Sequence, residues 1–132
     1  MARRSVADPG PATKRFVPPA GQDEPAREAA RHLSAIMQEY AGIVRSREGL
    51  AQAKGLLARM AGLAGSGFAG RDWWEWQNSL TVARLVIEAA WLREESRGAH
   101  YRSDFPQARP EWLAHIVWQK DRGAEVCKLC LG

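Results

Sequence analysis

The residue types best suited to chemistry gather between positions 97 and 104, in the letters RGAHYRSD. Arginine, histidine, tyrosine and aspartate are common in active sites, where neighbouring charges perturb their pKa values. One sequence places no acid–base pair and no Ser/His/Asp arrangement in space, so we assign no catalytic, cofactor-binding or metal-binding residue. We expect these side chains to fasten the segment after a helix or to form an interface. The candidates are Arg97, Gly98, His100, Tyr101, Arg102 and Asp104.

The two cysteines, Cys127 and Cys130, form a C-x-x-C pair. Such a pair is half of a zinc site or a redox-active dithiol. His32, His100 and His115 supply no second half at matching spacing, and no βαβ pattern surrounds the pair. A strand would also point the two thiols to opposite faces. We therefore expect free thiols, with a metal site shared across a dimer as the alternative.

A long central helix must position the 97–104 group. It occupies the first two-thirds of residues 78–106 and carries two apolar stripes at helical spacing. The first stripe is Leu80, Ala83, Ile87, Ala90 and Trp91, and the second is Val82, Leu85, Val86 and Ala89. A helix that is apolar around more than half its circumference must be covered on two sides, so we place it in the middle of a bundle. We expect the polar residues 93–97 to form its last turn and Gly98 to end it in the left-handed conformation.

The start of this helix is crowded with tryptophan. Asp72 and Glu75 resemble a capping box. Of Trp73, Trp74 and Trp76, two could reach a bundle neighbour, and the third is expected to be exposed or at an interface. Trp73 and Trp74 therefore join the interface candidates.

Two further helices precede the central one. The first begins near Pro25, and its apolar stripe predicts a helix that continues to Val44. The second runs from Arg47 to about Leu63, with Ser46 as its N-cap. Its expected buried residues are Leu50, Leu57, Met60 and Leu63, and the glycine-rich letters GLAGSGFAG at 62–70 read as a flexible connection.

The two ends of the chain differ from this helical pattern. Residues 111–119 alternate as a strand, with Trp112, Ala114, Ile116 and Trp118 on one face, and residues 124–131 could return as a second strand. The first 24 residues are rich in Pro, Gly and Ala and read as a flexible arm, or as an arm that docks on a partner through Phe16 and Val17. The predicted fold class is all-α: a three-helix bundle at 25–106, a short extended hairpin within 107–132 and a disordered arm at 1–24.

Composition restricts the class of protein. The 132 residues suit one compact domain, with 45% hydrophobic and 26% charged residues. The formal net charge of +4 is dispersed among acids, so we expect no nucleic-acid partner. No apolar run is long enough for a membrane span, and no apolar segment follows Arg3 and Arg4 as in a secretory signal. A cytoplasmic location without membrane contact is the expectation.

Two segments resemble a known family. RHLSAIMQEYAGIVRSREGLAQA and NSLTVARLVIEAAWLREESRGAHYRSDFP are similar to the C-terminal helical domain of L-aspartate oxidase, which succinate dehydrogenase and fumarate reductase flavoproteins share. The resemblance covers roughly Ala29 to Pro106. Its most specific part is residues 95–100 followed by Arg102, Asp104 and Pro106, and AGIVRS at 41–46 comes next. Residues 112–118 look more like the tail of the dehydrogenase branch, whereas AGIVRS and HYRSDFP favour L-aspartate oxidase.

The resemblance implies flavin chemistry that this chain cannot carry out by itself. Such enzymes pass a hydride from a dicarboxylic substrate to FAD; in L-aspartate oxidase aspartate gives iminoaspartate on the route to NAD. Their flavin-binding and capping domains lie upstream. Here Gly65, Gly67 and Gly70 sit between helices with no preceding strand, so no G-x-G-x-x-G site is formed.

We therefore expect a non-catalytic accessory domain of an L-aspartate-oxidase-like FAD-dependent oxidoreductase. The chain would be a detached domain, an expressed fragment or one half of a split flavoprotein, and its partner would be a flavin-binding domain or subunit. Exposed tryptophans at 73, 74, 76, 112 and 118 would supply the contact surface. The alternative is a self-associating helical interaction module, a homo-oligomer without redox function.

Overall fold

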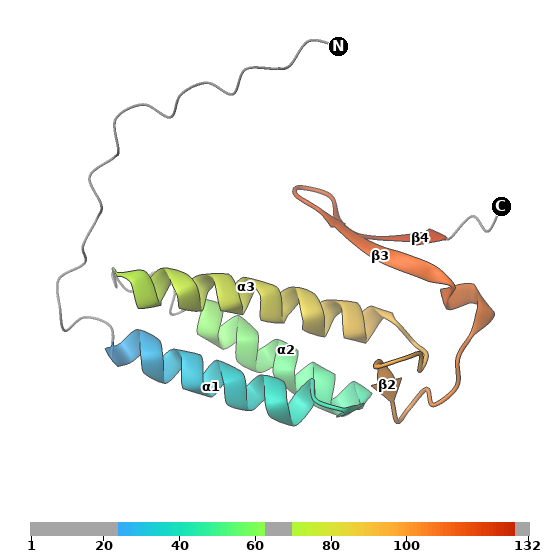
Figure 1. Cartoon of the computed structure of the whole chain (residues 1–132), viewed down its shortest axis with the longest axis horizontal. Coiled ribbons are helices and arrows are strands. Elements are labelled where there is room, and N and C mark those ends of the chain that lie inside the picture. The colour runs from blue at the N-terminus through green and yellow to red at the C-terminus, as the bar shows by residue number, and fades with distance from the viewer. Residues whose placement is uncertain (1–23, 63–69, 129–132) are drawn as a thin grey trace, which may run out of the picture.

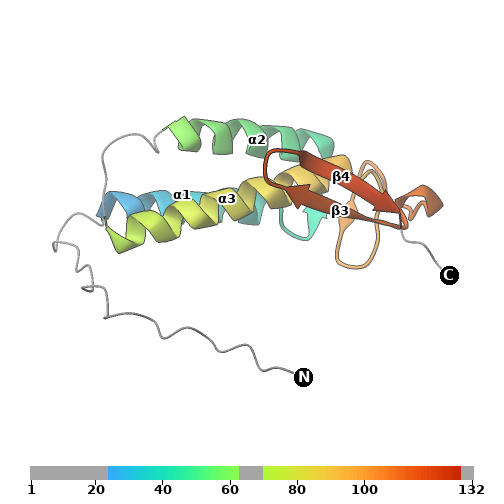
Figure 2. The same cartoon turned by 90° about the horizontal axis from the view of Figure 1, so that it is seen from above.

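The computed structural model describes residues 24–62 and 70–128. Three helices lie side by side, and a hairpin lies over the C-terminal half of the third (Figures 1 and 2). In chain order the elements are α1 (Glu24–Tyr40), β1 (Val44–Arg45), α2 (Arg47–Gly62), α3 (Arg71–Leu92), β2 (Tyr101–Arg102), the 3₁₀ helix η2 (Pro110–Trp112), β3 (Ala114–Gln119) and β4 (Gly123–Lys128). No described helix has an apolar stretch of the length needed to cross a membrane.

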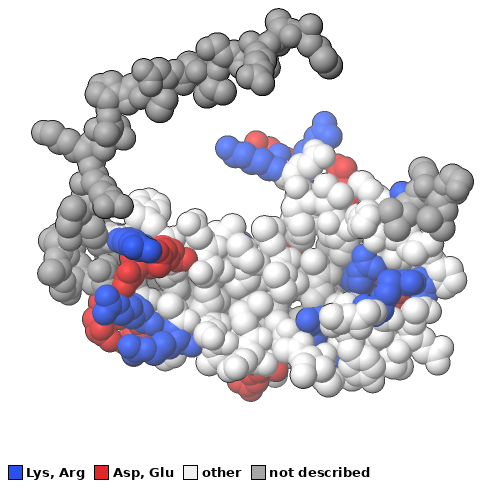
Figure 3. Space-filling model, in the orientation of Figure 1, with Lys and Arg blue, Asp and Glu red and all other residues white. Residues whose placement is uncertain are grey.

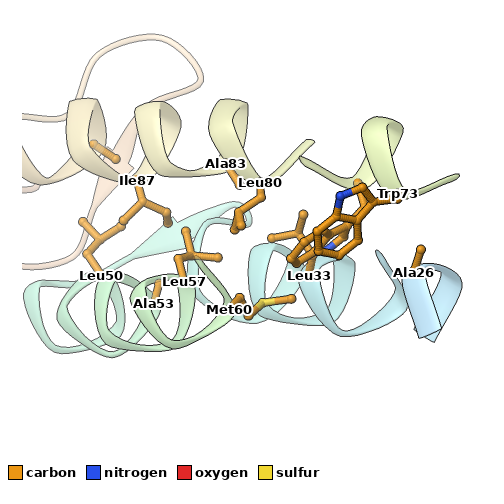
Figure 4. Close-up of a cluster of buried hydrophobic side chains, with 12 residues drawn as sticks. Ala26, Leu33, Leu50, Ala53, Leu57, Met60, Trp73, Leu80, Ala83 and Ile87 are labelled. Atoms are coloured by element: carbon orange, nitrogen blue, oxygen red, sulfur yellow. The ribbon is translucent and has the colours of Figure 1, made fainter. Parts of the chain in front are cut away.

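The core lies where the three helices meet (Figure 4). Burying one large aliphatic or aromatic side chain stabilises a fold by about 1.5–3 kcal/mol. The Ser46 hydroxyl caps α2 as predicted, because its Oγ accepts the Gly49 N–H at 3.1 Å. The buried side chains come from all three helices: Ala26, Leu33, Leu50, Ala53, Leu57, Met60, Trp73, Trp76, Leu80, Ala83, Ile87 and Ala90.

α3 is covered along one of its two apolar stripes. Leu80 and Ile87 are buried, but Val82 is 58% exposed and Val86 is 41% exposed. The expectation that helices cover α3 on two sides is therefore wrong. α1 and α2 both contact the first stripe, and the hairpin reaches only the C-terminal half of the helix (Figure 2). A helix in a three-helix bundle needs only one such apolar face, so the fold does not require the second stripe.

α1 ends at Tyr40, four residues earlier than its apolar stripe predicts. Ile43 and Val44, the last residues of that stripe, are 87% and 60% exposed. The chain turns sharply at Gly42, where an added Cβ would lie 2.6 Å from the carbonyl oxygen of Gln38. This close approach is available only to glycine, and it frees the next residues for β1.

Both ends of α3 differ from the prediction. The N-cap residue is Gly70, with no side-chain hydrogen bond, so the expected capping box is absent. The helix stops at Leu92, and Arg93 is already extended (φ −77°, ψ 100°). The polar residues 93–97 are therefore not a last helical turn. Gly98 does have a positive φ of 58°, but it serves a tight turn in which Arg97 and His100 exchange backbone hydrogen bonds.

The all-α fold class is wrong, because the chain also forms two small sheets. β1 pairs in parallel with β2, so that Val44 faces Tyr101 and Arg45 faces Arg102. This pairing joins segments more than fifty residues apart, which no local pattern could indicate. β3 and β4 form an antiparallel hairpin.

From Ala114 onward the hairpin follows the predicted alternation, but the strand expected to include Trp112 starts later, because Pro110–Trp112 forms the 3₁₀ helix η2. Ala114 is buried and Ile116 and Trp118 are partly buried, whereas His115 and Val117 are exposed. The return turn contains Asp121 and Gly123 in the left-handed region. Residues 1–23, Leu63 with most of the 62–70 connection, and Cys130 lie outside the described residues.

Candidate functional site

The most unusual feature of the fold is a buried carboxylate just beyond the end of α3. Glu95 is fully buried (0% exposed) and accepts hydrogen bonds from three directions. Arg93 Nη1 donates to Oε1 at 2.7 Å, Arg97 Nε donates to Oε1 at 3.0 Å, and the backbone N–H of Arg109 donates to Oε2 at 2.8 Å. Burial alone would raise the pKa of Glu95, but the bonds from Arg97, Arg109 and Arg93 outweigh it and lower the pKa to about 2.

Arg93 connects this carboxylate to the hairpin. Its Nη1 also donates to the Trp112 carbonyl at 2.9 Å, and its Nη2 donates to the Ala114 carbonyl at 2.7 Å. The guanidinium lies 5.4 Å from the centre of the Trp112 ring, within the range of a cation–π contact. The hairpin is therefore tied to α3 through one arginine, which pairs with the buried Glu95.

Arg102 closes the end of α3 from inside the fold. Its side chain is nearly fully buried, and Nη1 donates to the carbonyl oxygens of Ala90 at 2.8 Å and Trp91 at 3.1 Å. These are among the last carbonyls of the helix, which have no partner within it. The guanidinium also binds Asp104, with Nε to Oδ1 at 2.9 Å. The hydrogen bond from Arg102 holds the pKa of Asp104 below its usual value.

His100 is held as a neutral acceptor and donor. Arg45 Nη1 lies 3.0 Å from His100 Nδ1, and since a guanidinium only donates, Nδ1 must be the acceptor. Nε2 then carries the proton and donates to the Arg93 carbonyl at 3.2 Å. Burial lowers the pKa of His100, with the charges of nearby arginines acting in the same direction. Both ring nitrogens are thus engaged in the neutral form.

Ser96 fixes the loop that carries these side chains. Its Oγ donates to the Phe105 carbonyl at 2.8 Å and accepts the Arg102 N–H at 2.9 Å. The backbone N–H of Ser103 donates to the Arg45 carbonyl at 2.8 Å, next to the β1–β2 pairing. We call Arg93, Glu95, Ser96, Arg97, His100, Arg102 and Asp104 the junction cluster, because it joins α3, β1–β2 and the hairpin.

The predicted candidates separate into two groups. Arg97, His100, Arg102 and Asp104 lie together in the junction cluster, and Gly98 forms the turn that brings His100 back. Tyr101, by contrast, is 41% exposed beside Val44. Trp73 and Trp74 lie in the first turn of α3, at the end of the helix away from the cluster (Figure 1).

The tryptophans are mostly not a contact surface. Trp73 and Trp76 are buried in the core with ring centres 4.7 Å apart, so two of the three tryptophans at the start of α3 do pack inside the bundle, as predicted, whereas the expectation that all of them are exposed is wrong. Trp112 and Trp118 are partly buried with the hairpin. Trp74 is 65% exposed and keeps its place as an interface candidate.

Sequence reasoning gave no site role to Glu95, or to Arg45 beside the cluster. Glu95 was placed in a polar helical turn and in the segment most similar to the family, and Arg45 was noted only within AGIVRS. A local signal for Glu95 did exist, because arginines flank it at positions 93 and 97. Outside a helix, residues two apart lie on the same side of an extended chain, so both can reach one carboxylate.

The arrangement is suited to holding structure rather than to catalysis. Its carboxylates accept from guanidinium groups, and its histidine has no free nitrogen. Within residues 24–62 and 70–128, no group of three His, Cys, Asp or Glu side chains could hold a metal ion. Cys127 is exposed with a free thiol and lies opposite His115 in the hairpin.

Comparison with known proteins identifies the region around this cluster. Residues 69–129 match the family model described as "Fumarate reductase flavoprotein C-term". An FAD-dependent oxidoreductase of Methanocaldococcus jannaschii is 34% identical over 90 residues, which are 64% of this chain and 17% of that protein. One of the subunits of the CoM/CoB fumarate reductase of Methanothermobacter marburgensis is 38% identical over 99 residues, 68% of this chain and 18% of the relative. The L-aspartate oxidase of Streptomyces coelicolor is 36% identical over 99 residues, 68% of this chain and 17% of the relative.

The chain thus spans less than a fifth of the length of these relatives. The family match includes α3, the junction cluster and the hairpin. The chain belongs to the family of fumarate reductase and L-aspartate oxidase flavoproteins, and it carries that family's C-terminal domain.

Proposed function

We propose that this chain is the C-terminal accessory domain of an FAD-dependent oxidoreductase of the L-aspartate oxidase type and packs against a flavin-binding domain or subunit. The observation that carries the proposal is the second apolar stripe of α3, which the fold leaves uncovered at Val82, Leu85 and Val86. A large exposed apolar surface usually marks a contact with another protein. Relatives named as L-aspartate oxidase, as a fumarate reductase component and as an FAD-dependent oxidoreductase indicate the class of partner.

The chain contributes structure rather than a catalytic group. The titratable side chains of the junction cluster are already paired with one another or with backbone carbonyls. A general acid or base needs a free position within hydrogen-bond reach of substrate. The parent reaction, oxidation of L-aspartate to iminoaspartate for NAD biosynthesis in the cytoplasm, would take place on the flavin-binding partner.

The described residues do not fit FAD. A dinucleotide site needs a strand that leads through a glycine-rich turn into a helix N-terminus. In the described part of the chain, β1 is the only strand followed by an α-helix, and the letters between them supply one serine and no glycine. FAD binding therefore falls to the partner.

A complementation experiment tests the proposal. The Streptomyces coelicolor L-aspartate oxidase, with its segment matching this chain deleted, is co-expressed with the chain or with empty vector. We expect the chain to co-purify, to increase the FAD retained by the truncated oxidase, and to restore aspartate-dependent oxidation. The chain alone, incubated with FAD, should retain no flavin absorbance. Failure to co-purify and to restore activity would overturn the proposal.

Self-association is the second candidate function, favoured by the same exposed stripe, because a second copy could cover it. Light scattering of the purified chain separates the two. A stable dimer that has no effect on the truncated oxidase would support an interaction module instead.

A further inference from the structure

An apolar groove runs between α1 and α3 on the face seen in Figure 3. It has a volume of about 500 Å³ and is bordered by Leu33 and Met37 of α1 and by Val82 and Val86 of α3. The middle of this face is largely free of charged side chains, which gather at the two ends of the bundle (Figure 3). Two residues of the second stripe of α3, Val82 and Val86, thus face α1 across the groove.

The groove leads into a second, basic pocket. This pocket has a volume of about 340 Å³ and lies between α3, β1 and β3. Val86 borders both cavities, so they adjoin at this side chain. The polar side chains that line the pocket are Arg45, Arg93 and His100.

One cationic side chain that lines the pocket, Arg45, has no carboxylate partner among the described residues. Arg93 pairs with Glu95 at 2.7 Å, a carboxylate that it shares with Arg97, and His100 is neutral because its Nδ1 accepts from Arg45. Arg45 donates to His100 and, through Nε, to the Ala41 carbonyl at 3.2 Å. Within residues 24–62 and 70–128 it forms no ion pair with a carboxylate, and its Nη2 makes no hydrogen bond.

Such a charge calls for a partner. Arg45 is partly buried among Val86, Ala89 and Ile116, and burial favours loss of its charge. Charged groups removed from water are normally paired. A guanidinium with a free edge matches a carboxylate in particular, because its planar N–H groups fit the two oxygens.

We propose that this surface of groove and adjoining pocket binds the flavin-binding domain, and that a carboxylate side chain of that domain pairs with Arg45 while apolar side chains beside it fill the groove along Val82 and Val86. The inference rests on the proposed function and specifies its interface. The occupant is a protein rather than a small anion because an apolar groove of about 500 Å³ offers nothing to an anion, and Val82 is 58% exposed without a partner.

The surface is tested by measuring how tightly the chain binds the truncated Streptomyces coelicolor oxidase. The oxidase is co-expressed with the chain and then separated from it before the measurement. Two variants address its two halves: Arg45→Gln removes the charge, and Val82→Asp places a carboxylate in the groove. Arg59→Gln is the matched control, because it removes an exposed positive charge from α2, outside the groove and the basic pocket. Thermal unfolding of each free variant shows whether it is folded.

We expect Arg45→Gln and Val82→Asp each to weaken binding about tenfold or more, and Arg59→Gln to leave it unchanged. The Kd of the wild type should also rise more steeply with salt than the Kd of Arg45→Gln. If Arg45→Gln fails to fold, Val82→Asp decides, since Val82 is on the exposed face of α3.

The outcomes separate this inference from the proposed function. If the wild type binds and restores activity but both variants bind equally well, the surface is wrong and the accessory role stands. If the wild type neither binds nor restores activity, the accessory role itself falls. A wild-type homodimer that Val82→Asp dissociates would make a second copy the occupant. Stabilisation of the wild type by sodium succinate, absent in Arg45→Gln, would make it a small dicarboxylate. Either result overturns the inference.

Discussion

Replacing Glu95 by glutamine should strongly destabilise the domain, although it is a conservative change. The side chain keeps its size, but one oxygen becomes an NH₂ group. Oε1 now accepts from Arg93 and Arg97, and Oε2 accepts from Arg97 and the Arg109 N–H. Whichever oxygen is replaced, a donor then faces donors.

The size of the effect follows from burial. Glu95 is 0% exposed and the side chain of Arg93 is 18% exposed, so water cannot replace the lost carboxylate. Removing one partner of a buried ion pair costs about 3–5 kcal/mol. Arg93 would also lose the charge that balances its bonds to the hairpin. We expect Glu95→Gln to lower the free energy of unfolding by that amount.

Urea denaturation at pH 7, followed by tryptophan fluorescence, measures the loss. Glu94→Gln is the matched control, because the neighbouring carboxylate is 41% exposed and its pair with Arg47 is long, at 3.8 Å. An exposed pair of this kind contributes at most about 1 kcal/mol. The reasoning is refuted if the two variants lose similar stability. The difference in the free energy of unfolding between wild type and Glu95→Gln should also become smaller in acid. The pKa of Glu95 in the folded protein, about 2, lies below the ordinary value of 4.5, so the stabilisation is lost as the pH falls through that range.

Three further changes test other parts of the junction. Arg102→Gln should cost about 3–5 kcal/mol in urea denaturation, because a buried cation and its bonds to helix carbonyls are lost; an equal loss in Arg84→Gln, at an exposed site on α3, would contradict this. Gly98→Ala should destabilise the domain by about 1–2 kcal/mol, because a φ of 58° is unfavourable for a residue with a Cβ. No neighbouring atom would obstruct that Cβ, so the backbone conformation alone sets the cost. Gly55→Ala in α2, where the space around a Cβ is equally open, should instead stabilise the domain by about 0.5–1 kcal/mol. If urea denaturation shows that both alanine variants change the free energy of unfolding in the same direction, the backbone argument is refuted. The lowered pKa of His100 means that the wild type should lose stability as the pH falls below 6.5, and melting temperatures of His100→Gln should not show that loss.

Periodicity predicted the parts of the fold that local geometry controls. Leu80 and Ile87 are buried because residues at helical spacing share one face. The hairpin alternates as predicted for the same kind of reason. Val82 and Val86 have the same spacing and the same hydrophobicity, yet they are exposed. Apolar character alone does not say whether a face is covered by the same chain or by another.

Contacts distant in sequence explain what the sequence did not predict. Residues 93–97 include good helix formers, so propensity favours continuing α3. The helix stops because the extended Arg93 reaches Trp112 and Ala114, and Arg102 binds the free carbonyls that the helix leaves. The β1–β2 pairing and the Arg45–His100 contact likewise join residues that lie 55 or more positions apart in the chain. The sequence therefore singled out most of the junction residues by their chemical type, but it did not indicate which residues they contact.

The junction cluster also bears on how the proposed surface would bind. Arg45 lies in β1, His100 beside β2, and Ile116 in β3; strand pairing joins β1 to β2, and the junction cluster ties them to α3 and to the hairpin. If they moved independently, forming the basic pocket would cost ordering entropy at each binding event, and affinity would fall by that cost. Because Glu95 and Arg102 fix these segments to the end of α3, the pocket exists before the partner arrives. A stable polar junction beside an uncovered apolar stripe is therefore what a prebuilt docking surface requires.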